Sequence, residues 1–165
     1  MKKVVLVRHA KSDWGGEGLK DIDRPLNERG YDDAYRLSEW FFETHTVPQK
    51  FISSDATRAL STANIFARNL IYPTNEISIQ PQVYESTAEV LKNVITDIDN
   101  KLDYVVLFGH NPGITNLVNE LGQELFFDNI PTCGIVCLEF DVKTWKEVPA
   151  KKAKKVFHQF PKEFK

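Results

Sequence analysis

The feature that most constrains the fold is an uninterrupted apolar run, Tyr104–Phe108, which is followed directly by Gly109. Such a run without polar alternation is typical of a strand buried on both faces, as in the parallel sheets of α/β proteins. A second run of this kind, Lys3–Val7, stands near the amino terminus. Strands buried on both faces need helices above and below them, so we expect a three-layer α/β/α sandwich with a mostly parallel sheet.

The segments around these two runs alternate between the helical and the extended pattern. Apolar residues at helical spacing predict four helices, at Glu28–Glu43, at Asp55–Leu70 with Asp55 as N-cap, at Ser86–Asn100, and from Gly113 to about Leu121. Short apolar segments predict further strands at Phe51–Ser54 and Ile77–Gln80, and a hairpin of Gly134–Phe140 with Thr144–Val148 at one edge of the sheet.

The bulk composition narrows the class of protein. A length of 165 residues fits one domain, and we expect residues 1–165 to form it. The net charge of −2 does not favour nucleic-acid binding. No apolar run approaches the ~20 residues that span a bilayer, so we expect no membrane association. Two cysteines are too few for a disulfide framework, which makes a cytoplasmic location the default expectation.

A cluster of lysines stands near the carboxyl end. Its members are Lys151, Lys152, Lys154 and Lys155. The simpler interpretation is a solvated terminal segment, and the alternative is a docking patch for an acidic partner.

Charged residues follow three of the predicted strands at the point where each strand ends. Arg8 and His9 end the first strand, Arg58 comes shortly after the second, and His110 follows the buried strand. Because ligands of open α/β sheets bind at the carboxyl ends of strands, we expect these side chains to converge. Converging cations disfavour one another unless an anion lies between them, and the planar fork of arginine suits the oxygens of a phosphate.

These residues lie in motifs that resemble the histidine phosphatase superfamily, also called phosphoglycerate-mutase-like. The motifs are Arg8-His9-Ala10-Lys11-Ser12, the segment Ser54–Ala63, and Gly109-His110-Asn111-Pro112-Gly113. Within the superfamily the chain is most similar to the small SixA-type phosphohistidine phosphatases. The segments that carry this closer resemblance are Asp23–Gly30, Val83–Ser86 and Phe160–Phe164.

The resemblance implies a covalent mechanism in which His9 is the nucleophile. Arg8 and Arg58 would clamp the phosphoryl oxygens, and His110 would donate a hydrogen bond to them. The backbone N–H of Asn111 would assist at the start of the following helix. The side chain of Ser12 is either a further phosphate ligand or a hydroxyl that stabilises its loop. No metal and no other cofactor is required by this chemistry.

The possible substrates differ in whether their leaving group needs a general acid. A phosphate ester expels an alkoxide that needs a general acid, for which Glu85 is the candidate by position. Glu85 is equally well explained as a carboxylate that stabilises the dipole of the helix from Ser86. A phosphohistidine needs less assistance, because a protonated imidazole leaves readily.

Three functions therefore remain in order of preference. The first is a phosphatase acting on phosphohistidine in a protein partner. The second is a phosphatase of small phosphate esters, or less favourably a phosphoglycerate mutase, with Glu85 as acid. The third is a non-catalytic module that binds phosphate groups. Phosphate itself is a ligand in every case.

Overall fold

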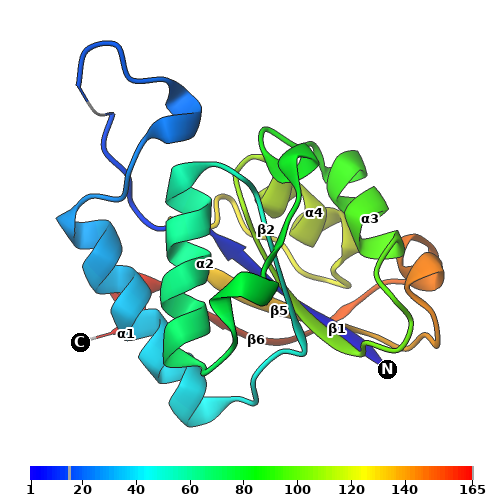
Figure 1. The fold of residues 1–165 in the computed structure, drawn as a ribbon. Coiled ribbons are helices and arrows are strands. Elements are labelled where there is room, and N and C mark those ends of the chain that lie inside the picture. Colours follow the sequence, from blue (N-terminus) through cyan, green and yellow to red (C-terminus); the bar gives the residue numbers. More distant parts are fainter. Residues whose placement is uncertain (15, 165) are drawn as a thin grey trace.

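The structure, a computed structural model, describes residues 1–14 and 16–164 (Figure 1). These residues form a six-stranded sheet with the strand order β3-β2-β4-β1-β5-β6. The strands are β1 (Lys2–Arg8), β2 (Lys50–Ser53), β3 (Ser78–Ile79), β4 (Tyr104–Gly109), β5 (Ile135–Phe140) and β6 (Lys154–Gln159). The α-helices are α1 (Glu28–Thr44), α2 (Thr57–Asn69), α3 (Ala88–Thr96) and α4 (Gly113–Leu121).

The two central strands are the apolar runs of the sequence. Strands β1 and β4 pair in parallel from Lys3 opposite Tyr104 to Arg8 opposite Gly109. The pairs β2–β4 and β2–β3 are also parallel, whereas β5 pairs antiparallel with both β1 and β6. The sheet is thus mostly parallel, as predicted.

Helices cover both faces of the sheet, which forms the middle of three layers (Figure 1). Val5 and Val7 of β1 belong to the core under α1 and α2, whereas Val4 and Leu6 belong to the core under α3 and α4. The side chains of β1 therefore alternate between two apolar layers, which is why this strand carries no polar face. The predicted α/β/α sandwich is confirmed. In the described part of the chain, no helix has both the length and the apolar character needed to cross a membrane.

The predicted hairpin is wrong in its second strand. Strand β5 pairs with β6, and the segment expected to be extended forms the 3-10 helix η4 (Trp145–Ala150). Local capping decides the outcome, because a carboxylate oxygen of Glu147 accepts hydrogen bonds from both the backbone N–H and the hydroxyl of Thr144. The Trp145 side chain is fully buried in the apolar core that also contains Val4 of β1 and Leu91 of α3. Lys154 and Lys155 begin the edge strand β6, where Lys154 is exposed and Lys155 is half-buried. Lys151 and Lys152, which precede the strand, are exposed as expected of a solvated segment.

Three further boundaries differ from the prediction. Asp55 is not the N-cap of α2: the helix begins at Thr57, after Ala56, whose N–H donates to the hydroxyl of Ser54. Helix α3 is shorter than expected at both ends, and Thr87 caps it through its side chain. The strand expected at Ile77–Gln80 is reduced to the two residues of β3.

The close approach of α1 to the segment after β1 gives a test of the packing. A Cβ atom at Gly30 would lie 2.0 Å from the carbonyl oxygen of Lys11. We expect Gly30→Ala to lower the free energy of unfolding by about 1–3 kcal/mol, because overpacking outweighs the better helix propensity of alanine. Chemical denaturation measures this. Gly16→Ala is the control: no described atom lies within 4 Å of the Cβ it would add, and we expect a change below about 0.5 kcal/mol. An unchanged free energy of unfolding in Gly30→Ala would contradict this close packing.

Candidate active site

The site is built where the chain leaves three neighbouring parallel strands. Beyond β1, the N–H of His9 donates to the carbonyl of Gly109 at 3.0 Å. Beyond β2, the N–H of Ser54 donates to the carbonyl of Phe108 at 3.1 Å. These bonds continue the ladders past the strand ends, so the segments that carry the charged residues leave the sheet side by side at its carboxyl edge.

A pocket of about 460 Å³ lies at this edge. It brings together six of the residues singled out in the sequence, namely Arg8, His9, Ser12, Arg58, His110 and Asn111. Lys11, Asp13, Trp14, Arg24, Asn27 and Thr132 complete its lining. The surface of the pocket is therefore dominated by cationic and polar groups and suits an anionic ligand.

The ring of His9 is held in one tautomer. Its Nδ1 donates to the backbone carbonyl of Ala10 at 2.7 Å, because a carbonyl oxygen can only accept. The proton therefore stays on Nδ1, and Nε2 keeps a lone pair. Burial, together with the nearby His110, Arg58 and Arg8, lowers the pKa of His9 to about 3, although the bond to Ala10 opposes this shift. His9 is thus a neutral imidazole at neutral pH.

His110 lies next to this nucleophilic candidate. The two ring centroids are 5.2 Å apart, and Nε2 of His110 shares a hydrogen bond of 2.8 Å with the hydroxyl of Ser54. Burial and the charge of Arg58 lower the pKa of His110 to about 4. Its Nδ1 is buried and has no hydrogen-bond partner within residues 1–14 and 16–164.

Two arginines line the pocket, Arg8 from the end of β1 and Arg58 from the first turn of α2. Nη1 of Arg8 donates to the carbonyl of Ile130 at 3.0 Å, and both terminal nitrogens of Arg58 donate to Asp21. Nε of each arginine is buried without a partner among the described residues. Burial and the charge of Arg58 lower the pKa of Arg8. Buried donors that lack partners are costly, and an oxyanion in the pocket would satisfy them.

The side chains of Ser12 and Asn111 are already engaged. The hydroxyl of Ser12 accepts from Nη2 of Arg24 at 2.7 Å, and its own proton has no acceptor among residues 1–14 and 16–164. The amide oxygen of Asn111 accepts from the N–H and the hydroxyl of Thr115, and its amide nitrogen donates to Ile130. Asn111 therefore ties the start of α4 to the neighbouring loop through its side chain, and only its backbone N–H is a candidate for ligand binding.

Glu85 is not brought to the pocket. Among the described residues it is absent from the pocket lining; its side chain is exposed, and its backbone has a positive φ of 53°. The neighbouring residue, Tyr84, turns towards the site and lies with its ring centroid 5.5 Å from that of His110.

Sequence reasoning missed Asp21. Its carboxylate accepts hydrogen bonds from Arg58, Arg24 and Tyr84, and these bonds hold the pKa of Asp21 well below its usual range. The same contact raises the pKa of Tyr84 to about 12. Asp21 lies in the short 3-10 helix η1 (Asp21–Asp23), where no periodicity marks it; its position three residues before Arg24 was the available signal.

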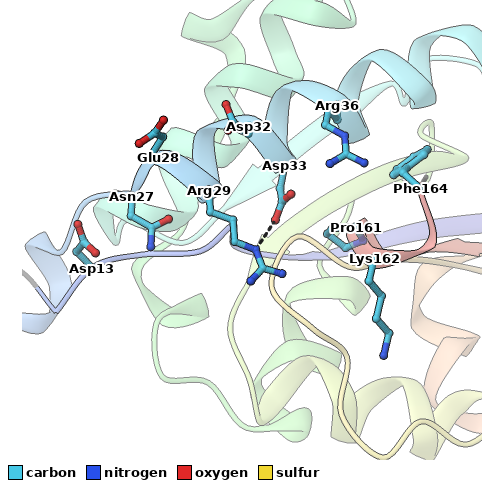
Figure 2. Close-up of a pocket in the computed structure, with 10 residues that line it drawn as sticks. All are labelled: Asp13, Asn27, Glu28, Arg29, Asp32, Asp33, Arg36, Pro161, Lys162 and Phe164. Atoms are coloured by element: carbon cyan, nitrogen blue, oxygen red, sulfur yellow. Dashed lines mark ion pairs between the residues drawn. The ribbon is translucent and has the colours of Figure 1, made fainter.

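A second, larger pocket of about 740 Å³ adjoins the first along α1 (Figure 2). The two share Asp13 and Asn27. Figure 2 shows the ion pair between Arg29 and Asp33, 3.7 Å apart, facing the carboxyl-terminal segment. None of the histidines lines this second pocket among the described residues, so its size does not make it the candidate site. No group of three or more His, Cys, Asp or Glu suited to a metal ion occurs among those residues either.

Comparison with known proteins identifies the family. The model of the histidine phosphatase superfamily (branch 1) matches residues 4–90. The chain belongs to the histidine phosphatase superfamily.

Individual relatives agree with this result. An uncharacterized chloroplastic protein of Arabidopsis thaliana is 27% identical over 154 residues, which are 88% of this chain and 70% of that protein. Phosphoglycerate mutase 1 of Saccharomyces cerevisiae is 37% identical over 67 residues, 39% of this chain but 27% of the mutase.

Solved structures match over almost the whole chain. A protein of Agrobacterium tumefaciens assigned as the phosphohistidine phosphatase SixA is 25% identical, with a TM-score of 0.78 and coverage of 96% of this chain and 97% of that one. The protein histidine phosphatase SixA complexed with tungstate is 18% identical, with a TM-score of 0.83 and coverage of 99% of both chains. The chain therefore has a SixA-type fold.

The lowered pKa values of the two site histidines predict how stability depends on pH. Between about pH 6.5 and pH 4 the unfolded chain protonates His9 and His110, whereas the folded protein keeps them neutral. Stability should therefore fall as pH falls through this range, by up to about 1.4 kcal/mol per pH unit for each histidine. Chemical denaturation at pH 7.0, 6.0 and 5.0 measures the slope. In a His9→Gln, His110→Gln double variant the slope should flatten; an unchanged slope would show that these residues do not cause it.

Proposed function

We propose that this protein is a phosphatase that transfers a phosphoryl group to Nε2 of His9 and then hydrolyses the phosphohistidine so formed. We propose further that its substrate is phosphohistidine carried by another protein. The observation that carries the proposal is the state of His9. Its Nδ1–H is fixed on the Ala10 carbonyl at 2.7 Å, and the ring is neutral in a pocket that it shares with two arginines and a second histidine.

The reaction has two displacements at phosphorus. In the first, Nε2 of His9 attacks phosphorus as the bond to the leaving nitrogen breaks, and the departing imidazole leaves with the proton it has taken up. In the second, water attacks the phosphohistidine, the bond between phosphorus and Nε2 breaks, and the proton of the water passes to solvent. Inorganic phosphate and neutral His9 are the products, so the enzyme returns to its starting state.

The surrounding donors stabilise the charge on the phosphoryl oxygens. Among the residues that line the pocket, Nε of Arg8, Nε of Arg58 and Nδ1 of His110 are buried donors without described partners, and each would gain one in the phosphoryl oxygens. A hydrogen bond from the Ser54 hydroxyl to Nε2 of His110 would keep the proton on Nδ1. The backbone N–H of Asn111 precedes α4 and adds a further donor at a helix amino terminus.

The absence of Glu85 from the described lining of the pocket favours phosphohistidine over an ester as substrate. An alkoxide leaving group needs a positioned acid, whereas an imidazole is a good leaving group once it is protonated. The likeness to SixA-type proteins points in the same direction. Hydrolysis of small phosphate esters with Glu85 as acid is the second candidate, supported by the partial match to phosphoglycerate mutases.

Removal of the nucleophile tests the covalent mechanism. We expect His9→Ala to abolish turnover, because the proposed mechanism requires Nε2 of His9 to accept the phosphoryl group. The fold should persist, since the change removes one largely buried ring at a sheet edge. Phosphatase assays and circular dichroism measure the two effects, and acid-labile ³²P on the wild type but not on the variant should mark the intermediate. Substantial turnover by a folded His9→Ala variant would overturn the mechanism.

A comparison of substrates tests the leaving group. We expect a phosphohistidine-carrying protein to be turned over at least about 10-fold more efficiently than a panel of small phosphate esters. Glu85→Gln should change kcat/KM for phosphohistidine less than about 2-fold, because the imidazole needs no acid from the enzyme. Glu43→Gln, at the far end of α1 and also exposed, is the matched control. Efficient ester turnover that Glu85→Gln destroys would instead identify an ester phosphatase with Glu85 as its acid.

A further inference from the structure

The carboxylate of Asp21 joins three segments of the chain that border the phosphate pocket. Its Oδ2 accepts from Nη2 of Arg58 at 3.1 Å and from the hydroxyl of Tyr84 at 2.5 Å, and its Oδ1 accepts from Nη1 of Arg24 at 2.9 Å. Arg58 comes from α2, Tyr84 from the turn before α3, and Arg24 from the segment between β1 and α1. One side chain thus connects α2, the turn before α3 and the segment between β1 and α1.

The contact with Arg58 fixes how that guanidinium is presented. Nη1 of Arg58 donates to the backbone carbonyl of Asp21 at 2.7 Å while Nη2 donates to its carboxylate. Both terminal nitrogens are therefore held on one residue, and the Nε edge is left without a described partner. Hydrogen bonds at both terminal nitrogens restrict rotation of the planar Arg58 guanidinium. The direction of its remaining N–H donors is therefore set before a ligand binds.

The contact with Arg24 extends the same constraint to the segment after the nucleophile. Nε of Arg24 donates to the carbonyl of Asp13 at 2.9 Å, and Nη2 donates to the hydroxyl of Ser12 at 2.7 Å. The guanidinium carbon also lies 3.9 Å from the ring centroid of Trp14. Ser12, Asp13 and Trp14 all line the pocket. Asp21 therefore holds one wall of the pocket through Arg24 and a second wall through Arg58.

The charge of Asp21 explains why a carboxylate stands beside a pocket for an anion. Asp21 is not among the described residues that line the pocket, so it does not face the ligand. It lies behind Arg24 and Arg58, two cations that would otherwise repel one another when no phosphate is bound. The carboxylate offsets this repulsion and keeps both arginines in place in the unliganded protein.

We propose that Asp21 is a positioning residue that pre-assembles the phosphate site: it holds Arg58 in its binding orientation and, through Arg24, holds the pocket segment Ser12–Trp14. The expected effect of Asp21 on turnover rests on the proposed function, whereas its expected effect on phosphate affinity does not. Positioning and a purely electrostatic role of Asp21 predict opposite changes in phosphate affinity when its charge is removed. Removing a negative charge near an anion would by itself strengthen phosphate binding, whereas loss of pre-assembly weakens it.

The test compares Asp21→Asn with Asp23→Asn. Asp23 belongs to the same 3-10 helix and is exposed, so it is a control of equal charge change. Titration calorimetry with inorganic phosphate, and with orthovanadate as a second oxyanion, measures affinity. We expect at least about a 10-fold weaker affinity for Asp21→Asn and less than about 2-fold for Asp23→Asn, because a small displacement of a clamp has large effects. Unchanged or tighter binding by Asp21→Asn would overturn the proposal.

Catalysis provides a second readout. With a phosphohistidine-carrying protein as substrate, kcat should fall at least about 10-fold in Asp21→Asn, since the clamp acts on the transition state. If the wild type turns over no phosphorylated substrate, the proposed function fails while the affinity measurements still decide the role of Asp21.

A milder variant covers the case in which Asp21→Asn does not fold. Tyr84→Phe removes one of the bonds to the carboxylate and leaves the charge in place. We expect phosphate affinity to fall about 2- to 5-fold in this variant without a matching loss of thermal stability. A loss of stability with unchanged affinity in Tyr84→Phe would make the cluster structural and would overturn the positioning role.

Discussion

The parallel pairing of β1 with β4 is the constraint on which the rest of the structure depends. Its last bond, from the N–H of His9 to the carbonyl of Gly109, lies just beyond the end of β1, so His9 and His110 leave the sheet together. A slip of one residue would turn every side chain of β1 to the opposite face. It would exchange the two apolar layers and also reverse the directions of Arg8 and His9. The core and the candidate site are therefore specified by one register.

The same register imposes an electrostatic cost. Two arginines and two histidines are brought to a largely buried sheet edge, and the protein limits this cost in two ways. It keeps both imidazoles neutral, since burial lowers their pKa values to about 3 and about 4. It also places the ionised carboxylate of Asp21 behind Arg58 and Arg24. What is left is a set of buried donors whose missing partners a phosphoryl group can supply.

The sequence predicted those parts of the molecule that local patterns determine. Uninterrupted apolar runs identified β1 and β4, and the residues after them belong to the pocket because strand ends converge in any parallel sheet. Asp21 could not be found in this way, because its partners Arg58 and Tyr84 are 37 and 63 residues distant and η1 has no periodicity. The hairpin prediction failed for a related reason. The cap formed by Thr144 and Glu147 and the burial of Trp145 favour a 3-10 helix, although the apolar spacing there also fits a strand.

The arrangement around Glu85 bears on the choice between phosphohistidine and a phosphate ester as the proposed substrate. Tyr84 and Glu85 are adjacent but differ in placement: the Tyr84 ring lies beside His110, whereas Glu85 is exposed and has a positive φ of 53°. It is Tyr84 that turns inward and donates to Asp21, which raises the pKa of its hydroxyl to about 12 and makes it a poor acid. The Tyr84 hydroxyl beside His110 thus bonds to the carboxylate that also holds Arg58 and Arg24. In the proposed function it is not the acid for the leaving group. Such a site would stabilise the phosphoryl group and would not supply an acid to the leaving group. This suits the proposed substrate, because an imidazole leaves readily once it is protonated.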